Sequence, residues 1–172
     1  EEAVTSCHTA LAIKPDYAEA NYNLGNALKE LGQLEEAIAS YHNALSIKPD
    51  FAEANYNLGV AFQDLGTLEE AITSYNKALA IKSDYAGAHC NLGTVYQELG
   101  KLEEAVASYH KALETKPDYD EAQNNLGLTL QELGRPEEAI GSYHKVLAIN
   151  PNFAEAHSNL GLALQELGKL DE

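Results

Sequence analysis

Apolar and small side chains recur along this chain at the spacing of one helix face, in two short runs that are repeated several times. In one copy the first run consists of Ala20, Leu24, Ala27, Leu28 and Leu31, and the second of Ala37, Ile38, Tyr41, Ala44 and Leu45. Steps of three and four residues predict an amphipathic helix for each run. Gly32 marks the end of the first helix, and Pro49 cannot continue the second.

Glycine fixes the period of this pattern. Apart from Gly87 and Gly141, the 12 glycines form two series with a step of 34 residues: Gly25, Gly59, Gly93, Gly127 and Gly161, and Gly32, Gly66, Gly100, Gly134 and Gly168. The register gives complete units at 18–51, 52–85, 86–119 and 120–153, with a second-helix half unit at 1–17 and a first-helix half unit at 154–172. We therefore predict a single all-α array of antiparallel helix pairs that fills residues 1–172.

One helix pair of this size cannot bury its own apolar face, so neighbouring pairs must cover it. Gly25 and its equivalents fall inside a helix, where glycine costs about 1 kcal/mol relative to alanine. A cost repeated in every unit predicts a close helix contact with no space for a Cβ atom. We expect Ala37 to permit the same approach and Tyr41 to fill the remaining space. Cys7 takes the tyrosine position in the first half unit, where we expect a buried, inert thiol.

The start of each first helix carries a candidate capping signal. Asp50 precedes the helix that begins near Ala52, and Glu53 follows three residues later. This spacing predicts a capping box in which aspartate replaces the usual serine or threonine. The same pairing recurs as Asp16 with Glu19, Asp118 with Glu121, and Asn152 with Glu155, and it fails at Gly87.

The unit resembles the tetratricopeptide repeat (TPR). The matching residues are Leu24, Gly25, Ala37, Tyr41, Ala44 and Pro49, with their equivalents in the other units. Two departures are polar residues where the family has tryptophan and Ser83 where it has proline. The resemblance covers the whole chain and implies a right-handed TPR superhelical solenoid, in which the first helices line a concave groove.

Composition excludes several classes of protein. With 27 acidic and 11 basic residues the net charge is −16, which disfavours nucleic acid and anionic membranes as partners. No apolar run approaches the roughly 20 residues of a membrane span. The chain has no secretion signal and no initiator methionine, so we expect a processed chain or a segment of a longer protein, located in the cytoplasm. Its two cysteines do not make a disulfide framework.

Signals for catalysis are weak, and we predict neither an enzyme nor a cofactor or metal site. Four histidines, His8, His42, His110 and His144, share one position in the unit, so each lies on a different helix pair. Adjacent helices lie about 8–10 Å apart, too far for neighbouring rings to hold one metal ion. The glycines form no phosphate-binding loop, and no Cys-x-x-Cys motif is present.

The predicted groove positions carry the most informative pattern in the chain. The sixth position is always asparagine, as Asn23, Asn57, Asn91, Asn125 and Asn159. The twelfth is Lys29, Gln63, Gln97, Gln131 and Gln165, and the thirteenth is acidic, as Glu30, Asp64, Glu98, Glu132 and Glu166. The fifth position varies as Tyr22, Tyr56, Cys90, Asn124 and Ser158, and the ninth as Asn26, Val60, Thr94, Leu128 and Leu162.

A carboxamide has both a donor and an acceptor, so a row of asparagines can hold an extended peptide backbone without reading its side chains. Such rows resemble those of the TPR superhelix of O-GlcNAc transferases, although this chain contains no transferase domain. Two alternatives stay open: the asparagines could be copies of one repeat without a function, or they could bond to a neighbouring helix. The acidic thirteenth position could equally serve solubility near a helix end.

These features predict a non-catalytic protein–protein interaction scaffold. Only Lys29 is basic among the groove positions, so we expect no clamp for a carboxylate terminus and instead an extended, neutral or basic segment. Candidate apolar anchors are Tyr22, Tyr56, Val60, Leu128 and Leu162. The alternatives are the substrate-recognition arm of a larger enzyme, such as a glycosyltransferase, and a self-assembling array. The two half units are complementary, and we hypothesise that copies stack end to end.

Overall fold

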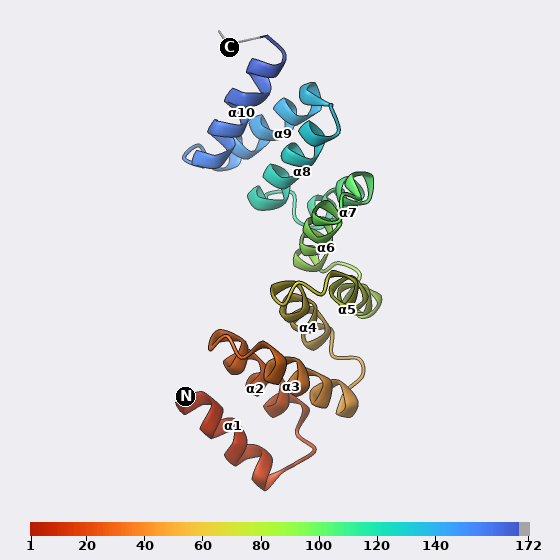
Figure 1. The fold of residues 1–172 in the computed structure, drawn as a ribbon, viewed down its shortest axis with the longest axis vertical. Helices are drawn as coiled ribbons and strands as arrows, with labels where there is room; N and C mark the ends of the chain where they lie inside the picture. Colours follow the sequence, from red (N-terminus) through yellow and green to blue (C-terminus); the bar gives the residue numbers. More distant parts are fainter. Residues whose placement is uncertain (169–172) are drawn as a thin grey trace. The chain divides into compact units, whose positions relative to one another are not determined.

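The structure, a computed structural model, describes residues 1–168. Within that range it contains ten helices and no strand (Figure 1). The first helices of the 34-residue repeats are α2 (Ala18–Glu30), α4 (Ala52–Asp64), α6 (Ala86–Glu98), α8 (Asp120–Glu132) and α10 (Ala154–Glu166). The second helices are α1 (Glu2–Ile13), α3 (Leu34–Ile47), α5 (Leu68–Ile81), α7 (Leu102–Thr115) and α9 (Pro136–Ile149).

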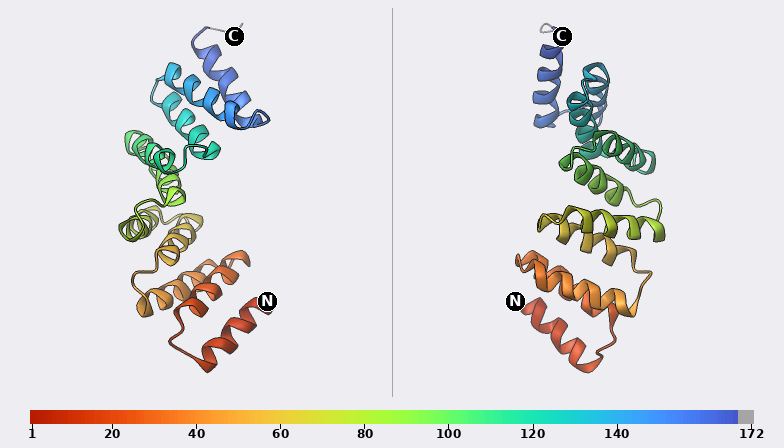
Figure 2. Two further views of the ribbon diagram at one scale, coloured as in Figure 1. Left: turned by 180° about the vertical axis from the view of Figure 1, so that it is seen from behind. Right: turned by 45° about the vertical axis from the view of Figure 1, so that its right-hand side comes forward.

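The chain divides into two compact units. The first, Glu1–Ser83, contains α1 to α5, and the second begins at Asp84 and contains α6 to α10. Inside each unit a helix packs against its neighbours in sequence, as α2 does against α3 and α8 against α9 (Figures 1 and 2). The predicted all-α solenoid of helix pairs is confirmed, and a single array over the whole chain stays a prediction.

Glycine ends each first helix as predicted. Gly32 has a positive φ of 75°, which glycine adopts at little cost, and its four equivalents also have positive φ. The Gln33 N–H donates to the Leu28 carbonyl at 2.9 Å, and the Gly32 N–H donates to the Lys29 carbonyl at 2.9 Å. These two bonds form a Schellman motif, which satisfies carbonyls at the helix end.

The glycine inside each first helix is in contact with the tyrosine of the second helix. A Cβ atom on Gly25 would lie 2.6 Å from Tyr41 Cε1, and one on Gly59 would lie 2.7 Å from Tyr75 Cδ1. The tyrosine rings are fully buried, so they cannot move aside freely. The predicted close contact is therefore confirmed for α2 with α3 and for α4 with α5, and the second unit repeats it at Gly93 and Gly127. It is not seen at Gly161 in α10, where a Cβ atom would meet nothing within 4 Å.

The predicted capping boxes are wrong. The N-cap of α4 is Phe51, one residue after Asp50, and it makes no side-chain capping bond. The Phe51 N–H donates to the Lys48 carbonyl at 3.3 Å, and the Phe51 ring lies under the Lys48 ammonium at 4.4 Å. Ring packing therefore holds this aromatic residue at the N-cap, so Asp50 lies outside the helix. The same displacement of Asp16, Asp118 and Asn152 is seen where Tyr17, Tyr119 and Phe153 are the N-caps.

The prediction of a buried Cys7 is also wrong. Cys7 is half-buried, because α1 packs against α2 alone among the described helices. Cys90, which lies on α6, is fully buried instead. Burial raises the pKa of the Cys90 thiol to about 12, so the thiol stays protonated at neutral pH.

Candidate functional site

In the first unit, three polar side chains meet on the surface formed by the first helices, which we call the first-helix face. Tyr22 and Asn26 come from α2 and Asn57 from α4, and together they form the amide cluster. Asn57 Nδ2 donates to Tyr22 Oη at 3.0 Å and to Asn26 Oδ1 at 2.8 Å. Tyr41 Oη, from α3, donates to the same Asn26 oxygen at 2.8 Å. The cluster therefore joins three consecutive helices through side chains.

These bonds fix the orientation of the Asn57 carboxamide. Both amino hydrogens of Asn57 are directed at acceptors, and rotating the amide would place its oxygen against the Asn26 oxygen. Within residues 1–168, Asn57 Oδ1 accepts no hydrogen bond, and the side chain is half-exposed. The arrangement presents a hydrogen-bond acceptor, already oriented, to a ligand on the first-helix face.

The aromatic rings around the amide cluster keep it in place. The Tyr22 ring lies 4.8 Å from the Phe51 ring and 6.1 Å from the Tyr41 ring, measured between centroids. Burial raises the pKa of Tyr41 well above its usual value, and the neighbouring Tyr22 and Glu30 add to the shift. The Tyr41 hydroxyl is therefore protonated at neutral pH and serves as a permanent donor to Asn26.

In the second unit, glutamine takes the place that Asn26 has in the first complete repeat as the acceptor for the buried tyrosine. Tyr109 Oη donates to Gln97 Oε1 at 3.3 Å, and Gln97 Nε2 donates to Glu132 Oε1 at 2.6 Å. The same two bonds join Tyr143, Gln131 and Glu166. Each of these tyrosine–glutamine relays links the buried tyrosine of one repeat to the acidic residue of the next. The carboxamides of Gln97 and Gln131 are thus engaged in the fold, as is the Gln63 oxygen, which accepts from Tyr75 at 2.8 Å.

The asparagine row is half-buried at four of its five positions. Asn159 donates to Asn124 at 3.2 Å, so it follows Asn57 in bonding to the preceding first helix. Asn125 forms a hydrogen bond with Tyr109. Burial raises the pKa of Tyr109, and the hydrogen bonds with Thr94 and Asn125 partly oppose this rise. Asn91 is half-buried and Asn23 is exposed. The alternative of a bond to a neighbouring helix therefore holds for Asn57 and Asn159, whereas contact with a ligand stays a prediction.

The candidate apolar anchors differ in exposure. Tyr56, Val60 and Leu128 are half-buried, and Leu162 is 55% exposed. The Tyr56 ring lies 5.9 Å from the Tyr75 ring, so it adds to the aromatic packing of the first unit. Each of these side chains thus offers part of its surface to a ligand and uses the rest in the fold.

Sequence reasoning missed the role of the ninth and twelfth positions as acceptors for the buried tyrosine. The first repeat has Lys29 at the twelfth position, which cannot accept a hydrogen bond, and it is the repeat that has an amide, Asn26, at the ninth. The other four first helices have glutamine at the twelfth position and no amide at the ninth. This compensation within one chain was a signal that could have revealed the tyrosine contact.

Within residues 1–168, no three His, Cys, Asp or Glu side chains gather to hold a metal ion. The four histidines of the shared position are exposed on separate second helices, as expected. In the same range no helix is both long and apolar enough to cross a membrane.

A family profile for the TPR repeat matches the chain five times, at residues 1–32, 25–66, 62–100, 95–134 and 130–168. The chain belongs to the tetratricopeptide repeat family. No curated protein matches its sequence.

Solved structures of other TPR proteins are similar to this one. The crystal structure of the MamA protein has a TM-score of 0.84 and 27% identity, over 90% of this chain and 84% of MamA. YrrB, described as a TPR protein with an unusual peptide-binding site, has a TM-score of 0.83 and 25% identity, over 98% of this chain and 87% of YrrB. Pseudomonas aeruginosa PilF has a TM-score of 0.79 and 28% identity, over 88% of this chain and 69% of PilF.

Proposed function

We propose that this TPR protein is a non-catalytic interaction scaffold that binds an extended peptide segment on its first-helix face. The observation that carries the proposal is the Asn57 carboxamide, which is held by Tyr22 and Asn26 with its oxygen left as an acceptor. The backbone N–H groups of an extended peptide are the donors that such an oxygen fits. A protein that contacts only the backbone of a peptide can bind segments of many different sequences, as an interaction scaffold requires.

The charge of the face favours neutral or basic segments. Glu30 and Asp64 are exposed at the ends of α2 and α4, and the chain as a whole carries a net charge of −16. Tyr22, Tyr56 and Val60 supply partly exposed apolar surface beside the amides. YrrB, which shares the fold and is described as having a peptide-binding site, supports binding of a peptide by such an array.

The test compares two asparagine variants against a pool of capped hexapeptides with neutral or basic side chains. Asn57→Ala removes the proposed acceptor, whereas Asn76→Ala makes the same chemical change at an exposed position of α5. One lost hydrogen bond of about 1 kcal/mol predicts about fivefold weaker binding for Asn57→Ala and no change for Asn76→Ala. N-methylation of the peptide backbone should weaken binding to the unmodified protein by a similar factor. Equal affinity of the two variants would refute the role of Asn57.

A further inference from the structure

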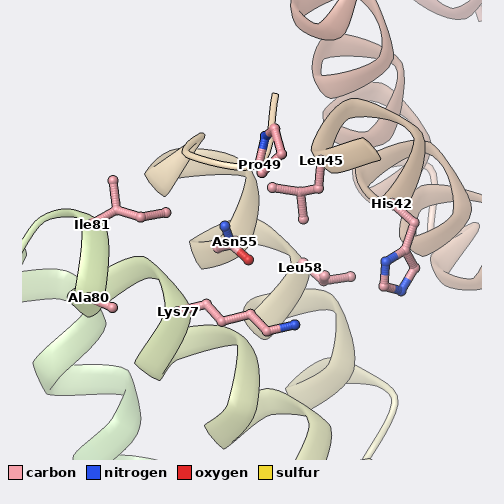
Figure 3. Close-up of a pocket in the computed structure, with 8 residues that line it drawn as sticks. All are labelled: His42, Leu45, Pro49, Asn55, Leu58, Lys77, Ala80 and Ile81. Atoms are coloured by element: carbon pink, nitrogen blue, oxygen red, sulfur yellow. The ribbon is translucent and has the colours of Figure 1, made fainter. Parts of the chain in front are cut away.

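A second concave surface lies in the first unit, between the second helices α3 and α5 and above α4. Its cavity has a volume of about 420 Å³, and Figure 3 shows the side chains around it. Leu45 and Leu58 form an apolar floor, and Ile81, which is 42% exposed, forms one wall. We call this surface the second-helix groove.

The groove continues along α5 into a second cavity of about 370 Å³. The two cavities share His42, Leu58 and Lys77, so they form one continuous surface. The second cavity reaches Glu69 and Glu70 at the start of α5, whereas the first reaches Ile81 at its end. Ile81 lies twelve positions after Glu69 along the helix, which corresponds to a groove length of about 18 Å.

The second-helix groove is separate from the first-helix face. The groove residues of α4 are Asn55, Leu58 and Phe62, whose spacing of three and four residues places them on one side of the helix. Asn57 is two residues from Asn55, a rotation of about 200° around the helix axis. A ligand in the groove would therefore lie on the other side of α4 from the amide cluster.

The chemistry of the groove changes from one end to the other. The Leu45 and Ile81 end is apolar, and the other end carries the exposed carboxylates of Glu69 and Glu70. Between them, the Lys77 side chain extends along the groove towards His42 (Figure 3). His42 itself packs edge-on against Phe62, with 6.2 Å between ring centroids. The Lys77 ammonium is thus placed to donate to a carbonyl of a bound segment, while its stem covers apolar surface.

We propose that the second-helix groove binds an extended segment of a partner protein that carries one apolar side chain and one lysine or arginine about five residues apart. The apolar side chain fits between Leu45 and Ile81, and the cation meets Glu69 and Glu70. The separation follows from the groove length, because an extended chain rises about 3.3 Å per residue and covers about 18 Å in five to six residues. The acidic rim and the net charge of −16 complement the basic residue of the segment.

The probe is a library of capped octapeptides in which one position is leucine and another is lysine, with serine and glycine elsewhere and the spacing between the two varied. Nuclear magnetic resonance titration of the full chain should select a spacing of about five residues, with the largest shifts at His42, Lys77 and Ile81. Ala80→Phe fills the groove from an exposed position on its wall and should weaken binding by at least about tenfold. Ala39→Phe makes the same change at an exposed position of α3 that lines neither cavity, and it should not alter binding.

Two further results decide the proposal. A double change, Glu69→Gln with Glu70→Gln, keeps the apolar end intact and should abolish the preference for lysine over glutamine in the peptide. Asn57→Ala should leave binding in the groove unchanged, which distinguishes this site from the first-helix face. If no spacing is preferred, or if Ala80→Phe and Ala39→Phe bind the library equally, the groove is not a binding site.

Discussion

The contact between a helix glycine and a buried tyrosine gives the sharpest prediction about stability. In Gly59→Ala the new Cβ atom would lie 2.7 Å from two carbon atoms of the Tyr75 ring, which is fully buried. Alanine favours the helix by about 1 kcal/mol over glycine. Displacing a packed ring costs about 1–3 kcal/mol. We therefore expect Gly59→Ala to be less stable than the natural chain by about 1 kcal/mol, although alanine is the better helix former.

Gly161 provides the matched control. It holds the same position in α10, and a Cβ atom there would meet nothing within 4 Å. Gly161→Ala should consequently be more stable by up to about 1 kcal/mol, because only the helix preference acts. Thermal unfolding followed by far-ultraviolet circular dichroism should show opposite shifts of about 2–4 °C for the two variants.

The contribution of the ring can be isolated with a double variant. Combining Gly59→Ala with Tyr75→Leu removes the ring that the Cβ atom would strike, so the two changes should cost less together than the sum of their separate costs. If Gly59→Ala stabilised the chain as much as Gly161→Ala does, the reasoning would be refuted, because the close approach of the new Cβ atom to the Tyr75 ring would then have no cost.

Three further results are expected. Gln131→Leu should lower the free energy of unfolding by about 1–3 kcal/mol in urea titration, since the buried Tyr143 hydroxyl loses its acceptor, and Tyr143→Phe in the same chain should recover part of the loss. Cys90 should resist a thiol reagent at about pH 8 until the chain unfolds, because its thiol is buried and protonated. Burial of the neutral thiol stabilises the fold below the usual thiol pKa, and this contribution should disappear as the pH rises towards about 12. Asp50→Ala should change the melting temperature little, whereas Phe51→Ala should lower it. A larger loss for Asp50→Ala than for Phe51→Ala would indicate that Asp50 caps the helix after all.

The sequence predicts the fold well because the same pattern of residues recurs in each repeat. The 34-residue period of Gly25 and Tyr41 fixes both the helix positions and the contact between them, since a glycine inside a helix needs a close neighbour to explain it. The start of α4 at Ala52 lies where the sequence predicted it, but the N-cap at Phe51 was missed, because it depends on a ring that packs against Tyr22, 29 positions away in the chain. Local capping rules do not include such a contact.

The candidate sites were predictable only in part. The row of asparagines is visible in the sequence, but the bonds from Asn57 to Tyr22 and Asn26 depend on the distance and rotation between α2 and α4. The same holds for the second-helix groove, whose walls come from α3 and α5 and therefore depend on the angle between successive helix pairs. End-to-end stacking and the resemblance to the groove of O-GlcNAc transferases stay predictions.

The most direct test of the proposed function is a crystal structure of the chain with a bound neutral or basic peptide selected from the hexapeptide pool. We predict an extended peptide on the first-helix face, with a backbone N–H within hydrogen-bond distance of Asn57 Oδ1 and the bonds from Asn57 to Tyr22 and Asn26 retained. A peptide bound elsewhere, with the amide cluster facing only solvent, would contradict it.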